Sequence, residues 1–212
     1  MFTLSNPPFT NQKGGTGKTT LSANLAVLWS NSQYKVAVID GDHQKSLTYW
    51  IEERKKYYGE NDIGFDVFSY DSRNLSEGIK KIKRKYNFVI VDSPPSITYD
   101  TIQIVKNVDK VFVPVQPSPV DLMATIPFLN LTKQERKKST VVLNRVMPRV
   151  RLTEAMILRL RYAGAKIARS RISSKTIFAE TFSAGRGVVD ISVNSEASRE
   201  IINLGNEILR NL

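Results

Sequence analysis

The sequence predicts an α/β fold with a doubly wound, mostly parallel sheet and helices on both faces. Four short runs rich in Val, Ile and Phe are predicted as buried strands, at residues 34–40, 87–92, 110–115 and 140–146. Nearly continuous apolar runs are typical of parallel strands that are covered on both faces. Amphipathic stretches that predict helices lie near residues 18–31, 45–58, 73–85, 98–107, 120–136, 152–163 and 193–211. This strand–helix alternation indicates the doubly wound arrangement.

Two further segments, 65–70 and 165–169, are weaker strand candidates. No linker, repeat or low-complexity tract divides the 212 residues, so we expect one domain, 1–212. A chain of this length buries about 70% of the surface that its unfolded form exposes, and it needs no disulfide or metal to fold.

The composition excludes several classes of site. There is no cysteine, which excludes cysteine nucleophiles, thiolate zinc sites and cysteine-ligated clusters, and which fits a reducing compartment. The single histidine, His43, argues against a histidine metal cluster. No apolar run reaches the length of about 18 residues that a membrane span needs, so we expect a cytoplasmic protein without stable membrane insertion. The net charge of +11 predicts attraction to polyanions such as nucleic acid or anionic lipid.

A glycine-rich segment, KGGTGKTT at residues 13–20, predicts a phosphate-binding loop. Its glycines let backbone N–H groups approach phosphate oxygens, Lys18 supplies a positive charge, and Thr19 offers a hydroxyl to Mg²⁺. The ordinary pattern G-x-x-x-x-G-K-[ST] fails, because its first glycine would fall on Gln12. A strand should precede such a loop, yet Pro7 and Pro8 lie there, so this strand is either short and shifted or unusual.

The segment 13–20 resembles the deviant Walker A box of the ParA/MinD family of P-loop ATPases. The resemblance implies that ATP and Mg²⁺ are the cofactors and that Lys13 crosses to the nucleotide of a second subunit, which gives an ATP-sandwich homodimer. Lys13 and Lys18 would then both act in catalysis. The implied nucleotide-binding residues of the loop are Lys13, Gly14, Gly15, Thr16, Gly17, Lys18, Thr19 and Thr20. A solvated loop position for Lys13 is the alternative.

Acidic residues follow two of the predicted strands. VAVIDGDHQKS at 36–46 resembles the D-x-D-P-Q box of ParA proteins, which implies that Asp40 lies near Mg²⁺ and that Asp42 orients or deprotonates the attacking water. His43 departs from the proline of that box, and a loop histidine is more often incidental than catalytic. YNFVIVDSPPS at 86–96 looks like a Walker B segment, in which Asp92 would hold Mg²⁺ through its water shell. Thr19, Asp40 and Asp92 are therefore the expected metal site.

Two segments match the family positions that surround the base. Asn144 can donate to and accept from the adenine edge, and Arg145 could stack on it. PVQPSPVDL at 114–122 resembles the proline-rich segment that lines the base pocket and the dimer face in small ParA proteins, which adds Pro117 to the cofactor-binding residues. In that segment we expect Asp121 to cap the following helix.

A cluster of basic residues between 145 and 175 fits DNA as the polyanion. The segment 168–191 resembles the C-terminal region of ParA proteins, which implies phosphate contacts from Arg169, Arg171 and Lys175. The terminal stretch 199–212 mixes acidic with basic residues, so we expect it to pack on the core rather than to bind lipid.

The resemblance runs from Asn11 to the terminal helix and is greatest to small ParA proteins (ParF-like), without an N-terminal helix-turn-helix extension. It implies a nucleoid-associated partition ATPase that segregates plasmid or chromosomal DNA with a centromere-binding, ParB- or ParG-like partner. A MinD-like membrane-positioning ATPase, a carrier of non-DNA cargo and a nucleic-acid-binding module without turnover remain alternatives.

Overall fold

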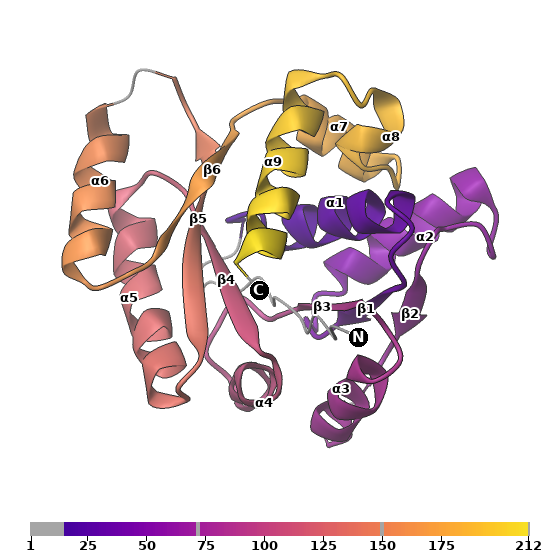
Figure 1. Cartoon of the computed structure of the whole chain (residues 1–212), viewed down its shortest axis with the longest axis horizontal. Helices are drawn as coiled ribbons and strands as arrows, with labels where there is room; N and C mark the ends of the chain where they lie inside the picture. Colours follow the sequence, from indigo (N-terminus) through magenta and orange to yellow (C-terminus); the bar gives the residue numbers. More distant parts are fainter. Residues whose placement is uncertain (1–14, 71–72, 149–150, 212) are drawn as a thin grey trace.

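The computed structural model describes residues 15–70, 73–148 and 151–211. Figure 1 shows the order of the elements along the chain. The helices are α1 Lys18–Asn31, α2 Ser46–Tyr58, α3 Leu75–Lys83, α4 Tyr99–Asn107, α5 Pro119–Gln134, α6 Arg151–Tyr162, α7 Ile177–Ser183, α8 Val188–Ile191 and α9 Glu196–Arg210. The strands are β1 Val36–Asp40, β2 Asp66–Phe68, β3 Phe88–Asp92, β4 Lys110–Val115, β5 Lys138–Val146 and β6 Ile167–Ser173.

The described strands pair in parallel, in the orders β2-β1-β3 and β4-β5-β6. Parallel neighbours require a crossover between them, and helices supply most of these connections. The expected first strand falls within residues 1–14, which lie outside the described residues. The parallel α/β prediction is confirmed.

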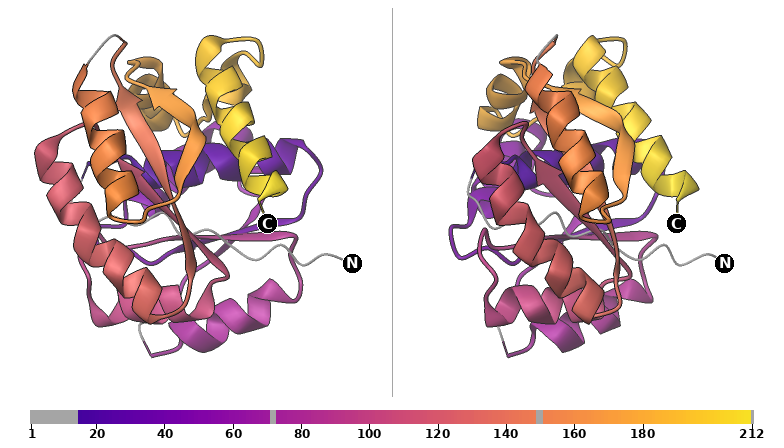
Figure 2. Two further views of the ribbon diagram at one scale, coloured as in Figure 1. Left: turned by 60° about the vertical axis from the view of Figure 1, so that its left-hand side comes forward. Right: turned by 90° about the vertical axis from the view of Figure 1, so that its left-hand side faces the viewer.

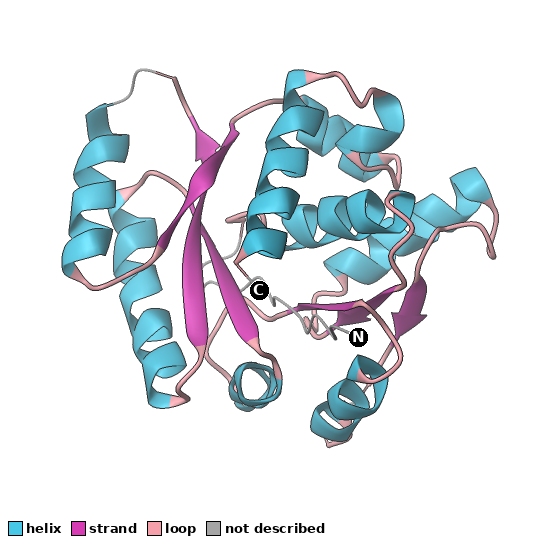
Figure 3. Ribbon diagram, in the orientation of Figure 1, coloured by secondary structure: helices cyan, strands magenta, loops and turns pink. Residues whose placement is uncertain are grey.

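Helices cover both faces of the sheet, as Figures 1 and 3 show. Alternate residues of a strand point to opposite faces. In β1, accordingly, Val36 and Val38 join a core with α1, α2, α7, α8 and α9, whereas Ala37 and Ile39 join a second core with α3, α4, α5 and α6. All five residues of β1 are buried. Strands buried on both faces explain the uninterrupted apolar runs of the sequence.

The C-terminal helix α9 packs inside the fold. Ile201, Leu204 and Ile208 are buried in the core that α9 shares with α1, and Figures 1 and 2 both place α9 beside β6. At Gly205 a Cβ would come within 2.5 Å of Leu28 Cδ2, so the glycine permits a close approach of α1 and α9. The expectation of a core-packing terminal helix is confirmed. Among the described residues, no helix combines the length and the apolar character that crossing a bilayer requires.

Candidate nucleotide site

The phosphate loop leads directly into α1. Gly15 and Gly17 have φ angles of 83° and 91°, in the left-handed region that favours glycine. Gly17 is the N-cap of α1, so the first N–H groups of the helix point out of its end, where an anion binds most favourably. Lys13 and Gly14, which were predicted to belong to this loop, lie outside the described residues.

The buried residues Lys18 and Asp92 and the half-buried Thr19 form a group at the start of α1. The Thr19 hydroxyl donates to Asp92 Oδ2 over 2.7 Å, and the Ser22 hydroxyl donates to Oδ1 over 3.3 Å. The pKa of Asp92 is raised to about 7, mainly by burial and also by the charges of Asp40 and Asp42, although the Thr19 hydrogen bond and Lys18 oppose the rise. Burial lowers the pKa of Lys18, and the two nearby carboxylates Asp92 and Asp42 counteract this. A hydroxyl and a carboxylate beside a buried ammonium suit Mg²⁺ and phosphate.

The two predicted strand-end acids lie side by side. Asp40 and Asp92 are directly paired in the register of β1 and β3, which brings their carboxylates to the same edge of the sheet. Asp40 accepts the N–H of Asp42 at Oδ1, and it accepts both the N–H and the hydroxyl of Thr48 at Oδ2, at 2.9 and 2.7 Å. Asp40 thus fixes the loop that carries Asp42. Its contact with Mg²⁺ stays a prediction, and Thr48 is a residue that the sequence did not single out.

Asp42 is buried next to the same site, where only 8% of it is exposed. Its Oδ1 accepts the N–H of Gln44 over 3.0 Å, which leaves the carboxylate anchored within the β1–α2 loop. A carboxylate so placed can orient water, and the role of Asp42 as catalytic residue stays a prediction.

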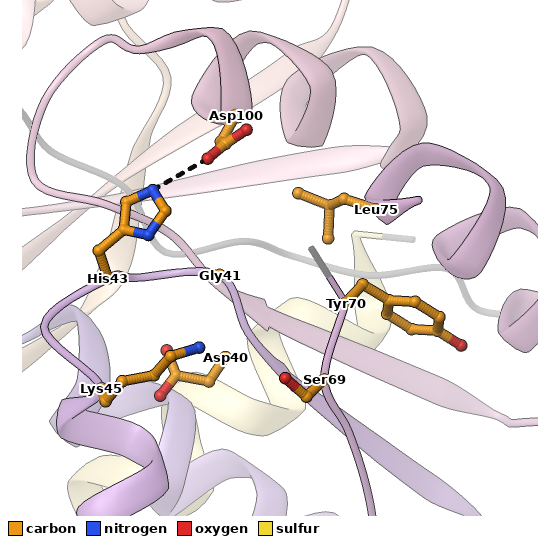
Figure 4. A pocket seen from close by; sticks show the side chains of 8 residues that line it. All are labelled: Asp40, Gly41, His43, Lys45, Ser69, Tyr70, Leu75 and Asp100. Atoms are coloured by element: carbon orange, nitrogen blue, oxygen red, sulfur yellow. Dashed lines mark hydrogen bonds and ion pairs between the residues drawn. The ribbon is translucent and has the colours of Figure 1, made fainter. Parts of the chain in front are cut away.

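The side chain of the neighbouring His43 contacts α4. Its Nε2 lies 3.1 Å from Asp100 Oδ2 in the first turn of α4. Figure 4 shows this pair among the residues that line a pocket of about 330 Å³. The pocket is lined by Asp40, Gly41, His43, Lys45, Ser69, Tyr70, Leu75 and Asp100. His43 therefore connects the β1–α2 loop to α4, a contact that the sequence did not predict.

A second cavity, of about 500 Å³, opens from the phosphate loop on the side of β5 and α7. Gly17, Thr20, Asn144 and Arg145 line it, so the two residues predicted to contact the base, Asn144 and Arg145, share one cavity with the end of the phosphate loop. Its far wall comes from Tyr49, residues 172–176 and α7, including Phe178 and Phe182. Sequence reasoning missed this aromatic wall because it did not predict α7.

Within this cavity Asn144 has a specific partner. It is buried, and its Nδ2 donates to the carbonyl of Thr16 over 2.7 Å. Arg145 is exposed and has a φ angle of 52°. Asn144 therefore contacts the phosphate loop itself, and the adenine contacts of Asn144 and Arg145 stay predictions.

The loop from β4 to α5 contains Pro117, which is half-buried. The expectation that Asp121 caps α5 is wrong: Ser118 is the N-cap, and its side chain accepts the N–H of Asp121. Asp121 instead accepts the N–H of Gln116, over 3.2 Å. The Gln116 side chain reaches the phosphate loop, where Nε2 donates to the carbonyl of Gly15 over 2.8 Å. Pro117 remains a predicted cofactor contact, and Gln116 was not predicted.

The three predicted DNA contacts lie on or next to β6, but they differ in their surroundings. Lys175 lies 3.1 Å from both Glu196 and Glu200, and Arg171 pairs with Glu154 at 3.2 Å. Of the three, only the Arg169 side chain forms no ion pair with a described residue. A groove of about 870 Å³ between β6 and α9 is lined by four basic residues, Lys166, Arg169, Arg171 and Arg210, and by two acidic residues, Glu200 and Glu207.

Comparisons with known proteins agree with this geometry. The family model "CobQ/CobB/MinD/ParA nucleotide binding domain" matches residues 9–188. The chain is similar to "Maintenance of carboxysome distribution protein A" of Halothiobacillus neapolitanus, with 29% identity over 97% of this chain and 98% of that protein. It is also similar to "Chromosome partitioning protein ParA" of Caulobacter vibrioides, with 25% identity over 94% of this chain and 91% of the relative.

Among solved structures, the cell division ATPase MinD of Pyrococcus furiosus superimposes with a TM-score of 0.83. The two chains are 22% identical, and the match covers 99% of this chain and 100% of that one, which shows a common fold. The family match spans most of the sequence and includes the loop and both strand-end acids. The chain therefore belongs to the ParA/MinD family of nucleotide-binding ATPases.

Proposed function

We propose that the chain is a positioning ATPase that binds ATP with Mg²⁺, dimerises on ATP, binds DNA without sequence specificity and distributes a cargo along the nucleoid in the cytoplasm. The observation that supports this most directly is the group of Lys18, Thr19 and Asp92 at the start of α1, in which Lys18 and Asp92 are buried. Bound Mg²⁺ would neutralise phosphate charge there, with Thr19 and Asp92 as its nearest protein groups.

Turnover is assigned to Asp42 and the two lysines of the loop. The carboxylate of Asp42 would orient the attacking water, Lys18 would balance charge on the triphosphate of its own subunit, and Lys13 on that of the partner. Asp42→Ala is expected to bind ATP and release no phosphate. Phosphate release from Asp42→Ala at the wild-type rate would refute the role of Asp42, whereas a wild-type chain that releases no phosphate would favour a binding module without turnover.

Dimerisation on ATP is supported by apolar side chains around the nucleotide site. Val120 and Met123 in the first turns of α5 are 61% and 75% exposed, and Met147 after β5 is 60% exposed. These side chains follow the carboxyl ends of β4 and β5, at the same edge of the sheet as the phosphate loop. Exposed apolar side chains gathered at one edge favour the binding of a protein partner there. Size-exclusion chromatography of Asp42→Ala with ATP should show a dimer, and Lys13→Gln should abolish it. Normal ATP dimers of Lys13→Gln would exclude the shared-lysine arrangement.

The groove between β6 and α9 is the proposed DNA surface. About three phosphate contacts per subunit give a salt slope of about −2.7, and a dimer about doubles it. ATP-dependent pairing would therefore switch DNA binding on. Because Lys175 is held between Glu196 and Glu200, Arg169→Ala should weaken DNA binding more than Lys175→Ala does. Equal affinities for DNA in the presence of ADP and of ATP, measured in a mobility-shift assay, would overturn this coupling.

The nucleotide site is compatible with two kinds of cargo. Plasmid or chromosomal DNA, delivered by a centromere-binding ParB- or ParG-like partner that stimulates hydrolysis, follows from the resemblance to ParA. A non-DNA cargo is favoured by the nearly full-length similarity to a carboxysome distribution protein. A pull-down with ATP and Asp42→Ala, which retains the ATP-bound form, would identify the partner. Liposome sedimentation with ATP tests the MinD-like alternative, and recovery in the pellet would support it.

A further inference from the structure

Two side-chain amides reach the phosphate loop from neighbouring strands. Gln116 follows β4 directly, and Asn144 lies near the end of β5; the residues before them, Val115 and Leu143, are partners in the parallel register. Gln116 Nε2 donates to the carbonyl of Gly15, and Asn144 Nδ2 donates to the carbonyl of Thr16. Since both acceptors are carbonyl oxygens, the amide nitrogens must face them. Two residues at the same level of the sheet thus hold two consecutive carbonyls of the loop.

The direction of a held carbonyl fixes the direction of an N–H group. In a trans peptide the C=O and the following N–H point in opposite directions. The bond from Gln116 therefore turns the N–H of Thr16 away from the Gln116 amide, and the bond from Asn144 turns the N–H of Gly17 away from the Asn144 amide. Successive N–H groups turned to one side form an anion-binding concavity.

We propose that Gln116 is a positioning residue that, together with Asn144, holds the phosphate loop in its anion-binding conformation; this rests on the proposed binding of ATP. Gly17 must lack a side chain for this arrangement, because a Cβ there would overlap the Asn144 amide nitrogen. Glycine is therefore needed at position 17 for two reasons, the close approach of the Asn144 side chain and the positive φ angle.

The backbone of Gln116 is itself fixed on both sides. Its N–H donates to the fully buried Asp121, and its carbonyl accepts the N–H of Ser118 over 2.7 Å. The side chain therefore reaches the loop from an anchored backbone, so the backbone of Gln116 needs no further ordering when the side chain forms the bond. A loop held in place before the ligand arrives binds it more tightly than a loop that must order on binding.

A ligand that has phosphates but no base distinguishes this positioning role of Gln116 and Asn144 from a contact with adenine. We use Gln116→Met, which keeps the size and removes the donor, and Asn144→Leu as the matching change on β5. Both variants should bind tripolyphosphate and ATP more weakly by the same factor, about three- to tenfold for one neutral hydrogen bond. Gln134→Met, at the exposed end of α5, is the control and should leave both affinities unchanged.

Calorimetric titration of the full chain with tripolyphosphate, and separately with ATP in the presence of Mg²⁺, gives the answer. A loss confined to ATP, or unchanged tripolyphosphate binding in Gln116→Met, would overturn the proposal. If Asn144→Leu does not fold, Gln116→Met with its half-buried site decides alone. A wild-type chain that binds neither ligand would overturn the proposed function and this proposal with it, whereas wild-type binding with an unaffected Gln116→Met overturns this proposal only.

Discussion

Replacing Asp92 by Asn should stabilise the ligand-free protein at neutral pH while it removes an expected Mg²⁺ contact. Asp92 is completely buried, and burial, with the charges of Asp40 and Asp42, raises its pKa from 3.8 to about 7. The folded state therefore holds a proton that the unfolded chain releases near pH 4. The free energy of unfolding then falls as the pH rises from about 4 to about 7. At about 1.4 kcal/mol for each pH unit, the ionised carboxylate costs about 4 kcal/mol above pH 7.

An uncharged amide at position 92 has no such dependence on pH, and the hydroxyls of Thr19 and Ser22 can rotate to pair with it. Urea unfolding in EDTA, without nucleotide, measures the difference. The advantage of Asp92→Asn over wild type should grow by about 3 kcal/mol between pH 5 and pH 8. Asp62→Asn, at an exposed position, is the control and should follow the wild-type curve. Parallel curves for Asp92→Asn and wild type would refute the assignment of a neutral, buried carboxyl.

Three further substitutions test other parts of the fold. Asp190→Asn breaks the buried ion pair between Asp190 and Arg54, whose charged atoms lie 2.7 Å apart. Because the Arg54 guanidinium stays buried, the free energy of unfolding in urea should fall by about 3–5 kcal/mol, and a fall below about 1 kcal/mol would contradict this. Gly185→Ala should lower the free energy of unfolding by more than about 2 kcal/mol in the same measurement, because the φ angle of Gly185 is 65° and a Cβ there would overlap the backbone of Arg54. A stability close to that of the wild type would show that the turn can relax. Thr48→Val removes a hydroxyl donor from Asp40 and should lower turnover about tenfold, with Thr48→Ser as the control that retains it; equal rates for the two variants would exclude this role.

The strands of the sheet and the glycine-rich turn that leads into α1 could be predicted because their signals are local. A strand buried on both faces must be apolar at nearly every position, and the glycines and Lys18 of the loop are contiguous in the sequence. The helices α7 and α8 were missed because they are short. They depend on tertiary burial of Phe178, Val188 and Val189 in the core beneath α1 and α9.

Contacts between distant segments decided how the site is arranged. The Gln116 side chain reaches a carbonyl 101 residues earlier in the sequence, and Asn144 reaches one 128 residues earlier. Asp121 was expected to cap its helix, but the folded loop gives that position to Ser118. Such hydrogen bonds follow from the parallel register, which brings the ends of β4 and β5 to the same level.

By itself, the sequence predicted which groups this protein would offer to a nucleotide: the loop glycines, Lys18, Thr19 and the acids that end β1 and β3. Only the tertiary structure decided which of the functional side chains are engaged in ion pairs or hydrogen bonds, because the partner residues come from other helices and strands. It places Lys175 between two glutamates of α9, binds Asp40 to Thr48, and buries Asp92 where its charge is costly. Residue type sets the chemistry that a side chain can perform, whereas burial and distant partners set its charge and its freedom to move.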